Sequence, residues 1–261
     1  MRDWLEVIIL GIIEGITEFL PISSTGHLLL AEQWLGQRTE YFTVFIQCGA
    51  VMAVIAVFKN RVRELFETRS DKKTKDYLAK MGCSFTLTAI GGLALKKAGW
   101  ELPEETAPVA WALLIGGVIF LLVDKEEKNN QQITQITWAL AIAFGLAQLV
   151  AMIFPGASRS GTTILIGIIL GMRREEAVEY SFLLGVPTLL AAGMYQLISA
   201  AREDHQAVIA EAPMLALGTA VSAITAFVVV KWLLAYLRTN TFNKFGWYRI
   251  ILGTLILLFA T

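Results

Sequence analysis

Charged residues are scarce in this chain of 261 residues. Lys and Arg number 22, Asp and Glu also number 22, and together they form 17% of the sequence, whereas soluble domains contain about 25%. Apolar residues reach 56%, and the mean hydropathy is +0.60. A soluble protein with this composition would expose large apolar patches, so the composition indicates an integral membrane protein. The net charge of zero excludes a polybasic protein that binds nucleic acid.

Cysteine is also rare, and linker sequences are missing. The two cysteines, Cys48 and Cys83, lie in apolar runs, which predicts buried small side chains rather than a disulfide. A cleavable signal peptide is not expected, because Glu14 and Glu18 fall where its apolar core would lie. No stretch rich in Pro and Ser divides the chain. We therefore expect a single membrane domain over residues 1–261.

Apolar runs predict ten helical segments in two sets of five. About 20 apolar residues are needed to cross the hydrocarbon core of a membrane. The expected segments are 4–20, 25–35, 41–58, 80–97 and 106–123, followed by 133–154, 160–172, 178–200, 212–236 and 246–261. These runs predict an all-α, polytopic helical bundle.

The first two segments of each set share a pattern. A glycine, a carboxylate or amide, a proline and a Ser-rich turn recur in order at an offset of 134, or 135 in the turn: Gly11, Glu14, Pro21 and Ser23–Gly26, then Gly145, Gln148, Pro155 and Ser158–Gly161. Chance similarity between turns of small residues is the alternative explanation. An internal repeat fits better because all the features recur in order, with repeat one at about 1–123 and repeat two at about 133–261.

The repeat predicts an inverted topology. If the first two segments of each half form a re-entrant hairpin, each half crosses the membrane three times and the second half must be inverted. One side then receives the loops at 59–80, 124–135, 173–177 and 237–245, and the other side receives residues 1–3, 35–40, 96–106 and 199–211. The first set holds 14 Lys and Arg residues and the second set holds 5. The positive-inside rule makes the first side cytoplasmic, so the first hairpin opens outward.

Glu14 and Glu18 are carboxylates in an apolar segment, where ionisable groups are costly and indicate function. Their spacing of four places both on one face of a helix. Without a basic neighbour in sequence, such a pair suits a divalent metal cation, Mg²⁺ or Ca²⁺, which prefers oxygen ligands. The alternative is a pair at a helix end that reaches the lipid headgroups.

The first turn contains Ser23, Ser24, Thr25, Gly26 and His27. One helix ends and another begins here, so free backbone N–H groups at the new N-terminus can hold an anion. The imidazole of His27 suits proton transfer near neutral pH. The hydroxyl residues also fit simple N-caps without a further role.

Arg159 is the only charged residue between Ile133 and Met172. A buried arginine needs an anionic partner, and its planar fork matches a phosphate group. The hydroxyls and helix N-terminus around it would complete the binding site; the residues in question are Ser158, Ser160, Gly161 and Thr163. Alternatively, Arg159 reaches the membrane surface or pairs with Glu18 as a structural bridge.

These groups together indicate phosphoryl transfer on a membrane lipid. Phosphoryl transfer requires neutralisation of charge and positioning of the reacting groups. The sequence offers a carboxylate pair for a metal, a histidine, hydroxyl nucleophiles and an arginine for phosphate. A site within the membrane favours a lipid phosphate or diphosphate as the substrate.

Two motifs closely resemble the signature regions of the bacterial undecaprenyl-diphosphate phosphatase family, also called bacitracin resistance proteins. The motifs are EGITEFLPISSTGH at 14–27 and PGASRSGTT at 155–163. Ser181–Leu184 with Pro187, and Tyr248 with Arg249, extend the resemblance over nearly the whole chain. Residues 83–88 differ, since CSFTLT stands where a proline-bearing apolar run is expected.

The resemblance implies hydrolysis of undecaprenyl diphosphate to the monophosphate at the outer, periplasmic face of the bacterial inner membrane. This step recycles the lipid carrier for peptidoglycan synthesis and cell wall biogenesis. It also implies a metal at Glu14 and Glu18, and catalytic roles for Ser24, His27 and Arg159. The match further assigns Ser158, Arg159 and Thr163 to the diphosphate. The sequence leaves open whether the protein forms a homodimer.

Two alternatives accompany this interpretation. A transporter or flippase for a polyprenyl phosphate lipid would share inverted repeats and an anion site, but it has no need for a carboxylate pair beside His27. A different lipid phosphatase family with a Ser-Gly-His element would require a second histidine paired with Asp. Within the preferred function, the sequence does not choose between Ser24, His27 and water as the nucleophile.

Overall fold

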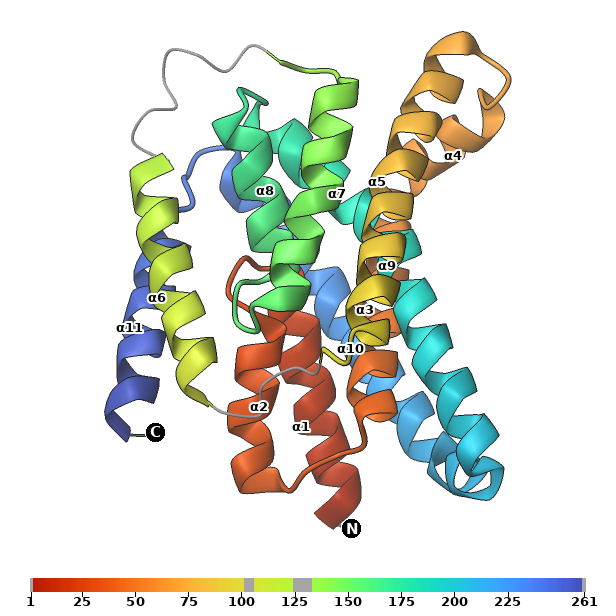
Figure 1. Cartoon of the computed structure of the whole chain (residues 1–261), viewed down its shortest axis with the longest axis vertical. Helices are drawn as coiled ribbons and strands as arrows, with labels where there is room; N and C mark the ends of the chain where they lie inside the picture. The colour runs from red at the N-terminus through yellow and green to blue at the C-terminus, as the bar shows by residue number, and fades with distance from the viewer. Residues whose placement is uncertain (1, 101–105, 124–132, 260–261) are drawn as a thin grey trace.

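The computed structural model describes residues 2–100, 106–123 and 133–259 (Figure 1). This part of the chain forms eleven helices and no β-strand, which confirms the all-α prediction. The helices are α1 (Arg2–Thr17), α2 (Ser24–Leu35), α3 (Glu40–Val57), α4 (Lys59–Glu67), α5 (Lys72–Lys97), α6 (Thr106–Val123), α7 (Trp138–Ile153), α8 (Arg159–Ile169), α9 (Arg174–Glu203), α10 (His205–Leu237) and α11 (Asn243–Phe259). Five of these, α3, α5, α6, α9 and α10, are long and apolar enough to cross a membrane, so the protein is a multi-pass membrane protein.

Two helical hairpins enter the bundle from opposite ends. Helices α1 and α2 descend from the central turn to the lower end of the molecule, whereas α7 and α8 extend from their turn to the upper end (Figure 1). The two turns meet inside the bundle, where Ser160 Oγ donates to the carbonyl oxygens of Glu18 and Leu20 over 3.1 and 3.2 Å. The halves therefore meet at their two turns, while the inverted repeat of the whole chain stays a prediction.

Each hairpin packs against a long helix of the other half. Helix α1 lies along α10, and α7 lies along α5. Glycines allow both close approaches, because a Cβ on Gly11 would lie 2.8 Å from the Gly218 carbonyl oxygen and a Cβ on Gly145 would lie 2.8 Å from that of Ser84. The glycines that were aligned in the sequence thus occupy comparable contacts.

Residues 83–88, which depart from the family pattern, form a polar contact between α5 and α7. Ser84 Oγ donates to the Ala141 carbonyl oxygen over 2.6 Å, and Thr88 Oγ1 donates to that of Gly145 over 3.1 Å. Gln148 Nε2 in turn donates to Thr88 Oγ1 over 2.7 Å. Hydroxyl groups therefore fix the α5–α7 contact at the place where apolar packing was expected.

Several predicted segment ends were wrong. Helix α1 stops at Thr17 rather than at residue 20, and α5 begins at Lys72 rather than at residue 80. The expected loop at 59–80 also contains α4, whose charged side chains form ion pairs on the surface. Helix α7 begins at Trp138 rather than at residue 133, because the Thr137 hydroxyl caps it by accepting from Leu140 N. Hydropathy does not detect such caps.

Helices α9 and α10 replace an expected external loop at 199–211. They are 30 and 33 residues long, and Asp204 is the single residue between them. Its carboxylate caps α10 by accepting from Ala207 N over 3.0 Å. The charged ends of both helices extend the helical structure beyond their apolar centres. Parts of the expected loops at 96–106 and 124–135 lie outside the described residues.

The cysteines agree with the sequence only in part. Both are free thiols, as predicted, and Cys48 is buried. Cys83 was expected to be buried, but it is only half-buried. The position of α5 explains the difference, since only 11% of the apolar stretch of this helix is buried within the bundle. Most of its surface faces outward, where an apolar thiol is suitable in a membrane.

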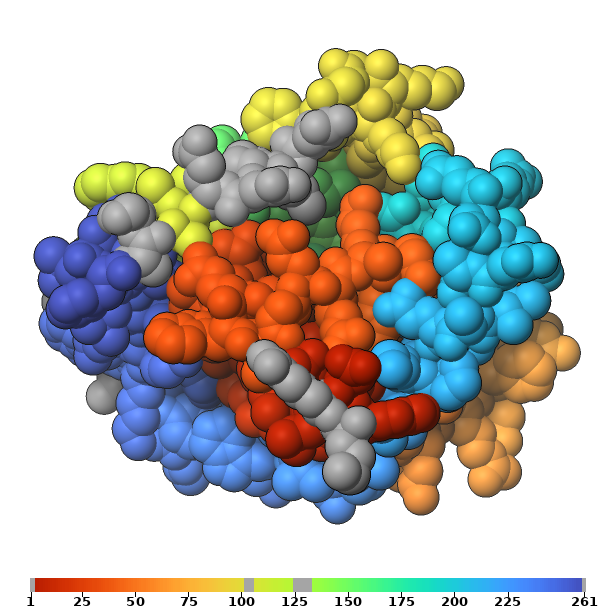
Figure 2. Space-filling view, turned by 90° about the horizontal axis from the view of Figure 1, so that it is seen from below, coloured from red at the N-terminus to blue at the C-terminus, as the bar shows by residue number. Residues whose placement is uncertain are grey.

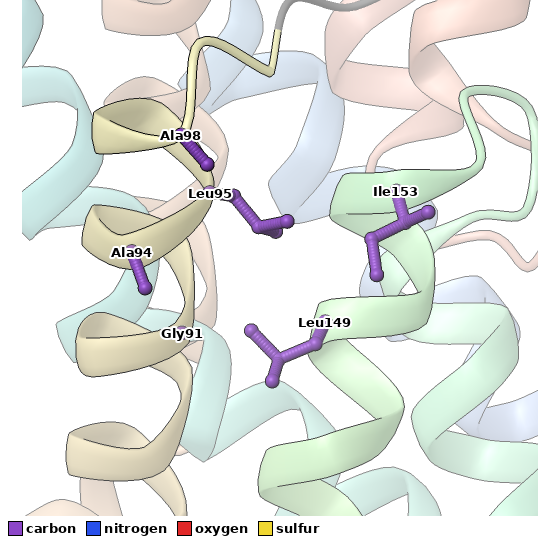
Figure 3. A pocket seen from close by; sticks show the side chains of 6 residues that line it. All are labelled: Gly91, Ala94, Leu95, Ala98, Leu149 and Ile153. Carbon is purple, nitrogen blue, oxygen red and sulfur yellow. The ribbon is translucent and has the colours of Figure 1, made fainter.

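The outer surface of the bundle carries an apolar groove. Seen from the lower end, α2 and the start of α3 occupy the centre, with α9 and the start of α10 on one side and α11 on the other (Figure 2). A groove of about 390 Å³ lies between α5 and α7, lined by Gly91, Ala94, Leu95, Ala98, Leu149 and Ile153 (Figure 3). These side chains offer no polar group, so the groove cannot hold a phosphate.

Candidate active site

The two turns have the same local structure. Ser23 and Ser158 both adopt positive φ angles, 75° and 70°, which residues other than glycine rarely adopt. Each serine caps the following helix, because its Oγ accepts from the backbone N–H three residues later, that of Gly26 at 3.2 Å and that of Gly161 at 3.1 Å. Helices α2 and α8 therefore both begin inside the bundle, and helix N-termini favour anions.

Glu18 connects the two turns through its carboxylate. Ser24 Oγ donates to Glu18 Oε2 over 2.7 Å, and Arg159 Nη2 donates to Glu18 Oε1 over 3.0 Å as an ion pair. The Glu18 side chain is 6% exposed. A hydroxyl, a carboxylate and a guanidinium therefore form a continuous chain of hydrogen bonds between α2 and α8.

Arg159 is held on several sides but keeps one donor without a partner. Nη1 donates to the Ser181 carbonyl oxygen of α9 over 3.1 Å, and the guanidinium lies 5.3 Å from the centre of the Phe19 ring. Gly185 makes room for it, since a Cβ there would lie 2.5 Å from Nη1. Nε is buried and has no hydrogen-bond partner in the described chain. The side chain is therefore held in place while one buried donor has no protein acceptor in the described chain.

Glu14 lies one helical turn before Glu18 on the same side. The backbone N–H of Glu18 still donates to the Glu14 carbonyl oxygen over 3.0 Å, so the predicted common face persists past the end of α1. Glu14 is fully buried, and neither carboxylate oxygen has a hydrogen-bond partner among the described residues. Glu18 and Arg159 both interact electrostatically with the Glu14 carboxylate.

These acceptors fit a divalent cation. Two unmatched carboxylate oxygens beside a second carboxylate are the kind of ligand that Mg²⁺ and Ca²⁺ prefer. No cluster of three or more His, Cys, Asp or Glu side chains with metal-binding geometry occurs in the described ranges. The chain itself would therefore supply two carboxylates, an arrangement common for Mg²⁺ when substrate phosphates complete the coordination.

His27 occupies the rim of the first turn. Its Nδ1 lies 2.6 Å from the Ser23 carbonyl oxygen, and its Nε2 lies 2.6 Å from the Tyr248 hydroxyl. Because a carbonyl only accepts, Nδ1 carries a proton, and in the neutral ring Nε2 accepts from Tyr248. The structure brings His27 to the turn, but both nitrogens are occupied by partners other than Ser24.

Most of the remaining predicted hydroxyls already bind protein groups. Ser23 caps α2, Ser160 donates to the first turn, and Thr163 Oγ1 lies 2.6 Å from Ser181 Oγ. Thr25 is exposed. Ser158 combines its capping role with a 3.1 Å contact to Ser160 Oγ. The hydroxyls expected to cradle phosphate therefore mainly shape the two turns.

Three parts of the site were not predicted from the spacing of residues in the sequence. The Ser181 carbonyl, the Gly185 surface and the Tyr248 hydroxyl come from α9 and α11, far along the chain from the turns. The resemblance to a known family included Ser181 and Tyr248 but gave neither a role. Backbone carbonyls and missing side chains leave no chemical mark in a sequence, so only the fold reveals them.

The fold and the site define a multi-pass helical membrane protein with a buried carboxylate–arginine centre between two hairpin turns. Residues 7–255 match the family model described as Bacitracin resistance protein BacA. Because the match covers most of the chain, this protein belongs to the bacitracin resistance protein family, as its motifs predicted.

Curated relatives share about half of their residues with this chain. A Rhizobium etli protein named undecaprenyl-diphosphatase is 48% identical over 262 residues, covering 98% of this chain and 96% of the relative. A Xanthomonas oryzae protein with the same name is 46% identical and covers 99% and 97%. A third, from Xanthomonas axonopodis, is 45% identical and covers 99% and 97%. The matches cover nearly the whole length of each relative.

Proposed function

We propose that this protein hydrolyses undecaprenyl diphosphate to undecaprenyl phosphate and inorganic phosphate. The names of relatives that match over nearly their whole length support this activity, and the family name links it to bacitracin resistance. Hydrolysis would return the lipid carrier to peptidoglycan synthesis. The chain of hydrogen bonds from Ser24 through Glu18 to Arg159 is the observation that carries the proposal.

In this mechanism Ser24 is the nucleophile and Glu18 is its base. The Ser24 hydroxyl already donates to Glu18 Oε2, which is the geometry that activates a hydroxyl. Ser24 Oγ attacks the terminal phosphorus, its proton passes to Glu18, and undecaprenyl phosphate leaves. Water then cleaves the phosphoserine to release inorganic phosphate. His27 lies at the rim with Nε2 toward Tyr248, where it can exchange protons with solvent.

Arg159 and the helix N-terminus bind the diphosphate. Nη2 of Arg159 can transfer its hydrogen bond from Glu18 to the substrate, and the buried Nε is a further donor once the side chain turns toward the phosphate. The cap that Ser158 Oγ forms with Gly161 N–H fixes the N-terminus of α8, which would bind the same phosphate. A divalent cation bound by Glu14 and Glu18 would neutralise charge that develops on the phosphoryl group.

We assign the reaction to the outer face of the bacterial inner membrane. The uneven distribution of Lys and Arg in the sequence supports a cytoplasmic location for the loops around α4. The start of α1 and the end of α11 lie toward the end of the molecule opposite α4 (Figure 1), and the first hairpin opens there. We propose that the substrate reaches the first turn from the periplasmic side, an assignment that accords with the predicted inverted repeats.

Phosphate release by purified protein in detergent tests the activity. We expect Arg159→Ala to abolish release and also to lower the midpoint of thermal unfolding, because Glu18 is left buried without its cation. Arg159→Lys keeps the charge but lacks the fork, so it should retain a small fraction of the release. Arg63→Ala on the exposed surface of α4 is the matched control and should retain full activity. A water-soluble isoprenyl diphosphate separates an enzyme from a transporter, since a pure transporter releases no phosphate. Wild-type turnover in Arg159→Ala would refute the proposed role.

A further inference from the structure

Arg249 of α11 joins both turns to the rest of the bundle. The side chain is fully buried. Nη1 donates to the Pro21 carbonyl oxygen over 3.1 Å, and Nη2 donates to that of Gly156 over 3.1 Å. Nη2 and Nε also donate to the carbonyls of Ala112 and Leu113 in α6, over 3.0 and 3.4 Å. One guanidinium therefore connects four carbonyl oxygens from both halves of the chain.

The two turn carbonyls stand at the same distance in sequence from the residues that end the hydrogen-bond chain. Pro21 stands three residues before Ser24, and Gly156 stands three residues before Arg159. Arg249 therefore fixes the backbone just ahead of each residue at the ends of the Ser24–Glu18–Arg159 chain. A change at Arg249 would alter the relative placement of the turns without removing any group that touches the substrate.

The space around the guanidinium is closely fitted. A Cβ on Gly116 of α6 would overlap Arg249 Nη2, and a Cβ on Gly161 of α8 would lie 3.5 Å from Nη1. The guanidinium is thus enclosed between α6 and the first turn of α8. Even a single added methyl group at position 116 would displace it.

The charge of Arg249 has no carboxylate partner in the described residues. Its hydrogen bonds all go to carbonyl oxygens, and the Phe120 ring lies 6.0 Å away. Burying a cation without an anion is costly, and arginine remains protonated under ordinary conditions. Among the described residues, the four carbonyl oxygens therefore supply the compensation for that charge.

We infer that Arg249 is a positioning residue that holds the two turns in register for phosphoryl transfer. The inference rests on the proposed function, because the groups brought into register are those proposed to react. Arg249 acts through Pro21 and Gly156 rather than by contact with the substrate. Misplacing reacting groups by about 1 Å can lower a rate by about 100-fold.

Kinetics of two substitutions test the inference directly. We expect Arg249→Met to lower kcat at least about 100-fold while KM changes less than about threefold, because Arg159 still binds the diphosphate. Arg249→Lys should recover part of kcat, since an ammonium group can donate to some of the same carbonyls. Wild-type kcat in Arg249→Met would overturn the inference, and so would an unchanged kcat with only a raised KM.

A glycine substitution tests the same contact without changing Arg249. Gly116→Ala should lower kcat by roughly tenfold or more, and it should cost much less in the Arg249→Lys background, where the slimmer side chain leaves room. Gly82→Ala in α5 is the matched control, because a Cβ there meets no atom within 4 Å. This pair keeps the inference testable if Arg249→Met does not fold. Equal effects of Gly116→Ala in both backgrounds would count against it.

A distance measurement separates this inference from the proposed activity. Spin labels at positions 34 of α2 and 169 of α8, on a protein without Cys48 and Cys83, report the relative placement of the two hairpins; Trp34 and Ile169 are 84% and 54% exposed. The distance distribution should broaden in Arg249→Met and Gly116→Ala but not in Gly82→Ala. An unchanged distribution would refute the positioning role, whereas a wild type without phosphatase activity would refute only the proposed function.

Discussion

Arg159 and Glu18, 141 positions apart in the chain, form an ion pair 3.0 Å long. Their side chains are 11% and 6% exposed, so the pair is nearly cut off from solvent. Removing one partner of such a pair leaves a buried charge without compensation, which is more damaging than losing a surface pair. Both the assembly of the two turns and the chemistry at the site therefore depend on this contact.

Glu18→Gln should reduce both activity and stability. The amide cannot accept the Ser24 proton, so we expect kcat to fall by about 100-fold or more. It also leaves Arg159 without an anion, which should lower the midpoint of thermal unfolding in detergent. Glu67→Gln on α4, which breaks the exposed ion pair with Arg63, should change neither value measurably. Normal turnover in Glu18→Gln would show that Glu18 is not the base.

Ser24→Ala tests the nucleophile. The substitution removes only the hydroxyl that donates to Glu18, so the protein should fold while phosphate release falls by about 1,000-fold. Thr254→Ala is a suitable control, since that hydroxyl only donates to Ile250 O within α11. Rapid quenching with a labelled terminal phosphate should trap a phosphoserine in the wild type. Substantial activity in Ser24→Ala would point to direct attack by water.

Glu14→Gln should alter the response to divalent cations. Chelation is expected to abolish phosphate release by the wild type, and added Mg²⁺ or Ca²⁺ should restore it. The amide replaces one charged ligand by a neutral one, so the cation concentration for half-maximal activity should rise by about tenfold or more. Cation binding to the variant, measured by calorimetry without substrate, should weaken in parallel. Full activity in the presence of a chelator would rule out the metal.

Gly49→Ala should destabilise the bundle without touching the site. Gly49 of α3 packs directly on the Thr219 carbonyl of α10, and a Cβ there would overlap that oxygen. Forced repacking of this kind costs about 1–3 kcal/mol. Unfolding titrations in mixed detergent micelles should show this loss relative to Gly82→Ala. Equal stabilities would mean that α3 and α10 adjust to the added methyl group at little cost.

Local features of the sequence predicted the scaffold well. Apolar runs located all ten expected segments, since burial in lipid requires continuous hydropathy. Pro21 and Pro155 marked the two turns, and the isolated charges at Glu14, Glu18 and Arg159 identified the side chains that now meet. Each of these signals depends only on neighbours along the chain.

Contacts made by backbone groups were beyond prediction. Arg249 was placed within a segment, but its four carbonyl partners come from three distant parts of the chain, and any residue can supply a carbonyl. The hydroxyls of Ser160 and Thr163 were assigned to phosphate because the sequence does not show that Leu20 and Ser181 approach them. The start of α7 at Trp138 depended on a single hydroxyl cap from Thr137.

The exchange of packing partners between the halves has a consequence for synthesis of the protein. Helix α1 rests on α10, and α7 rests on α5, so the first hairpin leaves the ribosome long before its neighbour exists. Until α10 is made, the surface of α1 that contains Gly11 lacks the helix on which it packs. A chain that stops after α6 would therefore leave the α1 surface that packs on α10 without its partner helix.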